Sequence, residues 1–102
     1  MTIYVVAVAG RSIVAFHAPS AAEADRRVRD LDFRDDLMSL TTDSVALWDG
    51  VTAIEVRQAV PREELRWRAS RARAVRHGSI EAADETWIAF LVPLTDPDRA
   101  YR

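Results

Sequence analysis

One part of the chain gathers residues that could bind a charged partner. Six arginines lie around a single tryptophan, Trp67, within fifteen residues. If this part is helical, a rotation of about 100° per residue places Arg62, Arg66, Arg73 and Arg76 on one arc of about 80°. A stripe of guanidinium groups can follow a phosphate backbone while a tryptophan stacks on a base. Arg and Trp are also common anchors of protein–protein interfaces.

Acidic residues offer a simpler interpretation of the arginine stripe. Glu64 and Arg68 have the favourable i,i+4 order for an ion pair within the helix. Further acids lie in the first predicted helical region: Glu23, Asp25, Asp30, Asp32, Asp35 and Asp36. If the two helical regions are neighbours, these acids can neutralise the stripe. With a net charge of −2, this favours an internally paired face over nucleic-acid binding by the helix 62–76. Contact with an acidic protein partner is the intermediate interpretation.

The sequence offers little metal or catalytic chemistry. His17 and His77 stand apart, the chain has no Cys, and no paired zinc-ligand spacing occurs. The sequence contains no Gly-rich phosphate loop and no nucleophile elbow. An enzyme would need a concave pocket that holds one of the two histidines beside a carboxylate. We therefore predict a non-catalytic protein with no cofactor and no metal.

Length and composition are typical of one small domain. The chain has 102 residues, of which 49% are hydrophobic, and all 14 of its basic residues are Arg. We assign residues 1–95 to a single domain and residues 96–102 to a C-terminal tail. No apolar run reaches membrane-spanning length, and the start lacks the basic residues and long apolar run of a signal peptide. We expect a cytoplasmic protein with no membrane partner.

Two segments near the start predict a β-hairpin. From Ile3 to Ala9 nearly every residue is apolar, so this strand has two apolar faces. Gly10-Arg11 follows, with Gly at the first central position of a two-residue turn, as a type II′ turn requires. Ile13 to Phe16 then returns as the second strand.

The next segment predicts a helix that changes direction. Ser20 and Glu23 match a capping box at its start. An apolar arc runs from Ala21 to Leu31, whereas the apolar residues between 33 and 40 lie on a different arc. We therefore predict a kink, or a second short helix, from about residue 33 to residue 40.

A second hairpin and a second helix are predicted further along the chain. Val45 to Trp48 and Val51 to Gln58 flank Asp49-Gly50, which is a strong hairpin signal. Side chains in the longer arm alternate between a more apolar and a charged face, which predicts an outer strand with one solvent-exposed face. Pro61 suits the first turn of a helix that ends at Gly78.

The last predicted strand runs from Thr86 to Leu94. Both of its faces are apolar, which predicts a place inside the sheet, and Pro93 marks where pairing stops. The predicted fold is therefore α+β in the order ββα-ββα-β. It has a mainly antiparallel sheet of about five strands, with two helices, the first kinked or split, on one face.

This arrangement leaves one apolar sheet face without a cover. We predict that Tyr4, Val6, Phe90 and Val92 lie on that face and dock a protein partner or a second copy of the chain. The alternative is that the helix from residue 33 to residue 40 covers the face internally. The residue pattern leaves both possibilities open.

We expect a small protein-binding module of the regulator, adaptor or inhibitor type that can form a homodimer. It would bind through the apolar sheet face and through a helix surface made of Arg62, Arg66, Trp67, Arg73 and Arg76. Trp67 is itself ambiguous, because it can also belong to a broad buried face of its helix. The alternatives are a nucleic-acid-binding protein that uses the same helix and a small enzyme with an unrecognised site.

Overall fold

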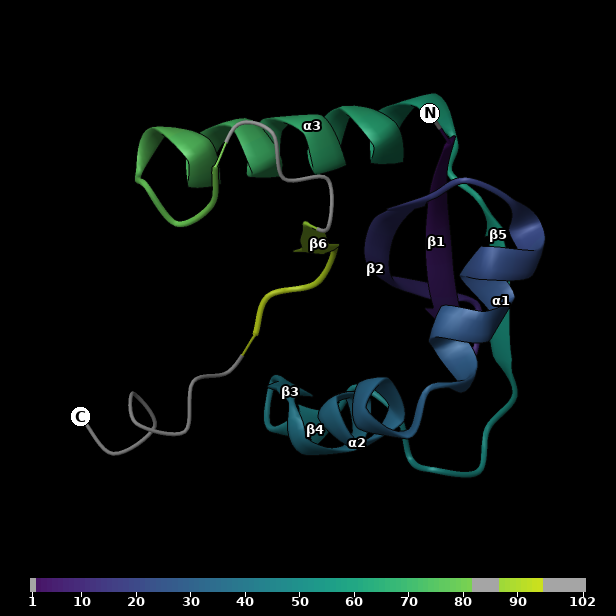
Figure 1. Cartoon of the computed structure of the whole chain (residues 1–102). Coiled ribbons are helices and arrows are strands. Elements are labelled where there is room, and N and C mark those ends of the chain that lie inside the picture. Colours follow the sequence, from purple (N-terminus) through teal and green to yellow (C-terminus); the bar gives the residue numbers. More distant parts are fainter. Residues whose placement is uncertain (1, 82–86, 95–102) are drawn as a thin grey trace.

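The computed structural model describes residues 2–81 and 87–94. The elements follow in chain order: β1 (Thr2–Val8), β2 (Arg11–Ala18), α1 (Ala21–Arg29), α2 (Leu31–Ser39), β3 (Thr41–Thr42), β4 (Val45–Ala46), β5 (Ile54–Gln58), α3 (Pro61–Arg76) and β6 (Ile88–Phe90) (Figure 1). The predicted α+β class with a mainly antiparallel sheet is confirmed. The predicted tail, residues 96–102, lies outside the described residues.

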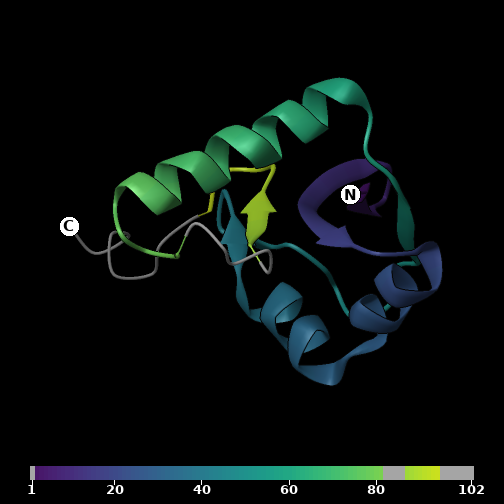
Figure 2. The ribbon, with the colours of Figure 1, turned by 45° about the horizontal axis from the view of Figure 1, so that its top comes forward.

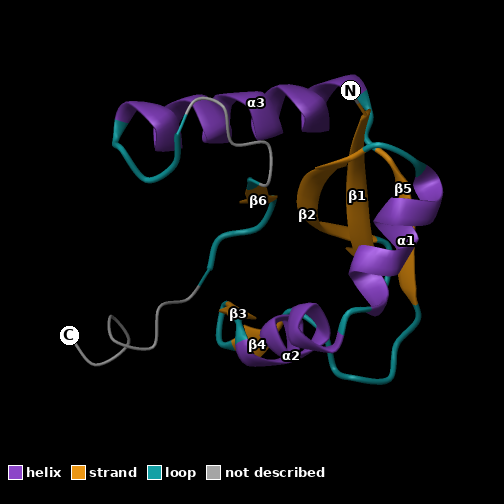
Figure 3. Ribbon diagram, in the orientation of Figure 1, coloured by secondary structure: helices purple, strands orange, loops and turns teal. Residues whose placement is uncertain are grey.

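The main sheet has four antiparallel strands, fewer than the five or so predicted, in the order β5-β1-β2-β6 (Figure 3). The predicted outer position of the strand from Val51 to Gln58 is confirmed by β5. The predicted interior position of the last strand is wrong, because β6 has three residues and lies at the opposite edge. An apolar pattern on both faces shows that a strand is covered above and below. It does not show that the strand has neighbours on both edges.

The first hairpin forms, but its turn lies one residue earlier than predicted. Val8 pairs with Arg11, so Ala9 and Gly10 are the central turn residues. Their φ angles are 52° and 78°, and two positive values are what a type I′ turn requires. A bulge between Val6 and Ala7 shifts the register of β1 against β2, which brings Ser12 opposite Ala7.

The predicted second hairpin across Asp49-Gly50 does not form. The Asp49 carboxylate accepts hydrogen bonds from Val51 N at 2.8 Å and from Thr52 N at 2.7 Å, and these bonds close a local loop. β4 pairs instead with β3 in a separate small sheet, and β5 pairs with β1. The Asp-Gly signal identified a turn but not the strands that it joins.

The predicted split of the first helix is confirmed. Ser20 Oγ accepts a hydrogen bond from Glu23 N at the start of α1. α1 ends at Arg29, and Asp30 then caps α2 by accepting hydrogen bonds from Asp32 N at 2.9 Å and Phe33 N at 3.2 Å. Leu31 is 75% exposed and does not join the buried arc that the sequence assigned to it.

The helices lie on opposite faces of the sheet, and the prediction of one shared face is wrong (Figure 2). One core cluster packs beneath α1 and α2 and includes Val6, Val14, Phe16, Val28, Leu37 and Val92. The other packs beneath α3 and contains Ile3, Val5, Ala15, Trp67, Ala89 and Leu91. Both faces of β1 and β2 are apolar, so each face requires its own cover.

This arrangement also overturns the predicted open sheet face. Val6 and Val92 are buried in the core, and Tyr4 is half-buried against the same cluster. The alternative that residues 33–40 cover this face internally is therefore correct. Phe90, at the sheet edge, remains 37% exposed.

Candidate functional site

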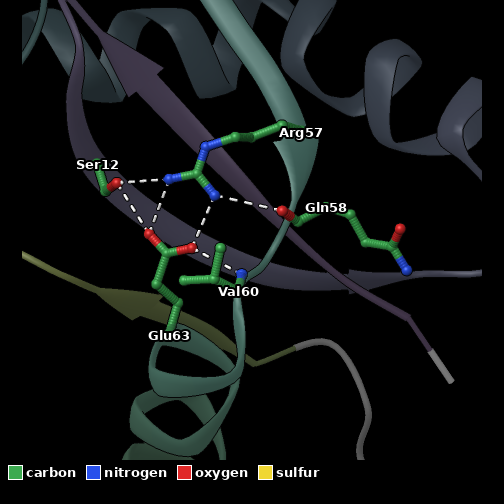
Figure 4. A network of polar contacts seen from close by, with 5 residues as sticks. All are labelled: Ser12, Arg57, Gln58, Val60 and Glu63. Atoms are coloured by element: carbon green, nitrogen blue, oxygen red, sulfur yellow. Dashed lines mark hydrogen bonds and ion pairs between the residues drawn. The ribbon is translucent and has the colours of Figure 1, made fainter.

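A network of polar groups around the buried Glu63 carboxylate holds the first turn of α3 against the sheet (Figure 4). Arg57 on β5 donates two hydrogen bonds to the Glu63 carboxylate, from Nη1 to Oε1 at 2.7 Å and from Nη2 to Oε2 at 2.9 Å. Ser12 Oγ donates to Oε2 at 2.9 Å, and Val60 N donates to Oε1 at 2.9 Å. Glu63 thus joins β2, β5 and the start of α3 at one point.

These bonds keep the Glu63 carboxylate ionised at neutral pH. The Arg57 hydrogen bonds are the main reason that the pKa of Glu63 falls from 4.5 to about 2, and the Val60 and Ser12 bonds lower it further. Burial raises the pKa but is outweighed. A carboxylate with all its acceptor positions engaged is a structural anchor, not a proton donor for chemistry.

Trp67 lies in the core. The sequence allowed either this buried position or an exposed one. The Trp67 side chain is 2% exposed, and its Nε1 donates to Trp87 O at 3.0 Å. Trp87 Nε1 in turn donates to Ser70 Oγ at 3.0 Å. The two tryptophans therefore fasten α3 to the segment that leads into β6, and α3 does not present Trp67 to a partner.

The arginine stripe of α3 lies on the surface, as predicted, but its expected acidic partners are elsewhere. Glu23 pairs with Arg26 and Asp25 pairs with Arg29, both within α1, on the far side of the sheet from α3. In the part of the chain that the structure describes, no carboxylate forms an ion pair with the four stripe arginines, which are Arg62, Arg66, Arg73 and Arg76. The neutralisation that the sequence suggested does not occur.

Two neighbouring hollows lie beside this stripe and share Arg66. The first, of about 310 Å³, is lined by Ser12, Arg62, Glu63, Arg66 and Leu91. The second, of about 340 Å³, is lined by Arg66, Ala69, Ser70, Arg73 and Phe90. Each hollow therefore has α3 on one side and the β6 segment on the other. We name this surface the α3–β6 groove and define it by the lining residues of both hollows.

A larger hollow of about 510 Å³ lies on the opposite helical layer. It holds His17 together with Glu23, Asp30 and Asp36, and its apolar wall includes Phe33. This is the concave setting that the enzyme alternative requires. Two of its carboxylates are already engaged, because Glu23 pairs with Arg26 and Asp30 caps α2.

Sequence reasoning placed the arginine stripe but missed the polar network beneath it. The alternation of the strand from Val51 to Gln58 predicts one solvent-exposed face, but it does not indicate that Arg57 binds Glu63. A usable signal was present: Glu63 lies three residues after Val60, the position from which a carboxylate reaches back to the residue before the helix. Nothing local points to Ser12 as its other partner, 51 residues away.

Among residues 2–81 and 87–94, no three or more His, Cys, Asp or Glu side chains are arranged so that they could hold a metal ion, and within the same ranges no helix is long and apolar enough to cross a membrane. Comparisons with protein-family models, curated proteins and solved structures found no match to this chain.

Proposed function

We propose that this chain is a small protein-binding module of the regulator, adaptor or inhibitor type, non-catalytic, whose binding surface is the α3–β6 groove. One observation carries the proposal. Arg62, Arg66 and Arg73 line two adjoining hollows and have no carboxylate partner among the described residues. Surface arginines without partners, next to a concave and partly apolar wall, are typical anchors for a protein partner.

The surface around the stripe mixes charge with apolar groups. Leu65 is 67% exposed, and it lies on α3 one position before Arg66. Leu91 and Phe90 form the other wall of the groove. A partner that covers this surface gains apolar burial as well as charge-assisted hydrogen bonds to guanidinium groups. A purely phosphate-directed surface gains nothing from the apolar part.

Nucleic-acid binding by α3 is the rival function, and the arrangement of α3 weakens it. Trp67 is buried and cannot stack on a base. The net charge of −2 supplies no general attraction to phosphate. Only the arginines, which have no carboxylate partner among the described residues, support nucleic-acid binding.

Affinity capture from a cell lysate, with the eluted proteins quantified, tests this proposal. We expect the double variant Arg66→Glu, Arg73→Glu to lose the proteins that the unchanged chain captures. Arg11→Glu is the matched control, because Arg11 is an exposed arginine at the start of β2 that lines a separate hollow with Thr42, Val45 and Leu47. It should retain the full set of captured proteins.

Two results would count against the proposal. One is a partner set that is the same for the double variant and for the unchanged chain. The other is capture that disappears after nuclease treatment and weakens steeply between 50 and 200 mM salt, which is the behaviour expected of a phosphate-driven complex.

A further inference from the structure

The outer edge of β6 lies beside the arginine stripe. β6 pairs with β2 along one edge, and within the described ranges no strand pairs with its other edge. Leu91 N donates to Ile13 O at 2.8 Å, so the Leu91 amide points toward β2. Backbone amides alternate in direction along a strand, and therefore those of Ile88 and Phe90 point away from β2. An edge with outward amides and carbonyls can accept another strand.

The α3–β6 groove lies next to this edge, because Phe90 of β6 is one of its lining residues. Phe90 lies opposite Val14, on the face that α1 and α2 cover. Phe90 nevertheless lines a hollow with Arg66, Ser70 and Arg73 of α3, which covers the other face. Phe90 also lines a second, apolar hollow on the α1–α2 side, so a hollow lies on each side of this residue of the edge strand. A chain that occupies the α3 side would run beside Phe90.

The side chains on the two sides of this edge differ in charge and polarity. On the α3 side are the three arginines of the groove, Arg62, Arg66 and Arg73, which form no ion pair with another described residue. On the other side a narrow hollow of about 50 Å³ has mainly apolar walls, formed by Val14, Phe33, Leu37, Leu40, Ile88 and Phe90, with Asp36. Successive side chains of an added strand point to opposite faces. Such a strand would place every second residue against arginine and the intervening residues against apolar groups.

We propose that the partner contributes an extended segment of alternating acidic and apolar residues that pairs with the outer edge of β6 as an additional strand. This inference rests on the proposed protein-binding function and names the partner chemistry. Backbone bonds to Ile88 and Phe90 hold the segment, and its carboxylates face Arg62, Arg66 and Arg73. Charge complementarity selects an acidic segment over a neutral one. The opposite edge strand, β5, offers no such stripe and packs against α1.

The probe for this proposal is a fluorescein-labelled heptapeptide, Ser-Glu-Val-Glu-Val-Glu-Ser, titrated with the full chain and followed by fluorescence anisotropy. We expect saturable binding. Replacing the three Glu of the peptide by Gln, or using the Arg66→Gln, Arg73→Gln variant, should weaken it about tenfold or more, since each lost charge-assisted bond contributes to affinity. Arg11→Gln should bind the peptide as the unchanged chain does.

Backbone pairing has a separate readout. On binding, hydrogen exchange of the Ile88 and Phe90 amides should slow, whereas the Ala89 amide, which points toward β2, should change little. A peptide N-methylated at alternate backbone nitrogens keeps its charges and should lose affinity. Equal binding by the methylated peptide would overturn strand addition, and equal binding by the Gln peptide would overturn the role of the arginines.

Other occupants of the groove would give different results. A dimer in light scattering that protects the Ile88 and Phe90 amides in the free chain would assign the edge to a second copy. Tighter binding of a single-stranded DNA oligonucleotide than of the peptide would assign the stripe to nucleic acid. Either result overturns the proposal. If lysate proteins depend on Arg66 and Arg73 but the peptide does not bind, the strand-addition model fails while the protein-binding function stands.

Discussion

At the residue scale, the Glu63 side chain connects Ser12 of β2 with Arg57 of β5. Its carboxylate binds Arg57, Ser12 and the Val60 amide, so three elements depend on its charge. Because these partners bind the ionised form, the folded-state pKa of Glu63 is about 2, below its unfolded value of 4.5. Its contribution to stability is therefore present above about pH 4.5 and is lost as the pH falls toward 2.

Glu63→Gln should lower the free energy of unfolding at neutral pH by up to about 3 kcal/mol, since the pKa difference corresponds to a free energy of that order. The difference from the unchanged chain should shrink as the pH falls from about 4.5 to about 2, because the unchanged chain then protonates Glu63. Urea unfolding at several pH values measures both effects. Glu64→Gln is the matched control: Glu64 forms an exposed i,i+4 pair with Arg68, so the change should be about 0.5 kcal/mol or less. A loss that stays constant across this pH range would contradict the assignment.

At the element scale, Asp30 separates two helices that would otherwise continue into each other. Its carboxylate accepts the Asp32 and Phe33 amides, which α2 itself cannot satisfy. The new helix axis turns Phe33 and Leu37 onto Phe16 and its neighbours. One capping residue thus decides which side chains cover this face of the sheet.

Asp30→Ala should destabilise the chain by about 1 kcal/mol, the usual cost of a lost N-cap. Denaturant unfolding followed by circular dichroism measures this loss. Asp35→Ala is the control, because Asp35 is exposed within α2 and caps neither helix; its effect should stay within about 0.5 kcal/mol. An equal loss in both variants would show that general charge, not capping, is responsible.

At the scale of the whole molecule, the fold is three layers in which α3 is held to the sheet by Trp67 and by the Glu63 network. Trp67 packs with Ile3, Val5 and Ala15, and its indole nitrogen bonds to Trp87 O. The groove therefore exists only while α3 stays in place. Variants in this core affect stability first and binding as a consequence.

Trp67→Ala should reduce the free energy of unfolding by about 3–5 kcal/mol, as large-to-small changes of buried aromatic residues do. Thermal and urea unfolding followed by circular dichroism measure the loss. Leu65→Ala, at an exposed position on α3, should change stability by about 0.5 kcal/mol or less and serves as the control. A Trp67→Ala chain that unfolds like the unchanged chain would mean that Trp67 is a surface residue after all.

Local signals in the sequence determined the features that depend on neighbours along the chain. Ser20 at the start of α1, Pro61 at the start of α3, and the glycine that ends α3 act within one helical turn. A break in this helical region follows from a change in apolar phase that is visible within twenty residues, although the phase placed it at about residue 33 and the structure has it at Asp30. The outward position of the α3 arginines followed in the same way from helical periodicity.

Tertiary structure alone decided which distant elements meet. Asp49-Gly50 predicts a turn, but the pairing of β5 with β1 instead of β4 depends on competition between strands far apart in sequence. The acids of α1 and the arginines of α3 were expected to pair, yet the sheet lies between them. Helix phase and strand alternation specify a buried face but not the surface that covers it. For that reason the edge position of β6 and the place of the α3 arginines beside it emerge only from the assembled fold.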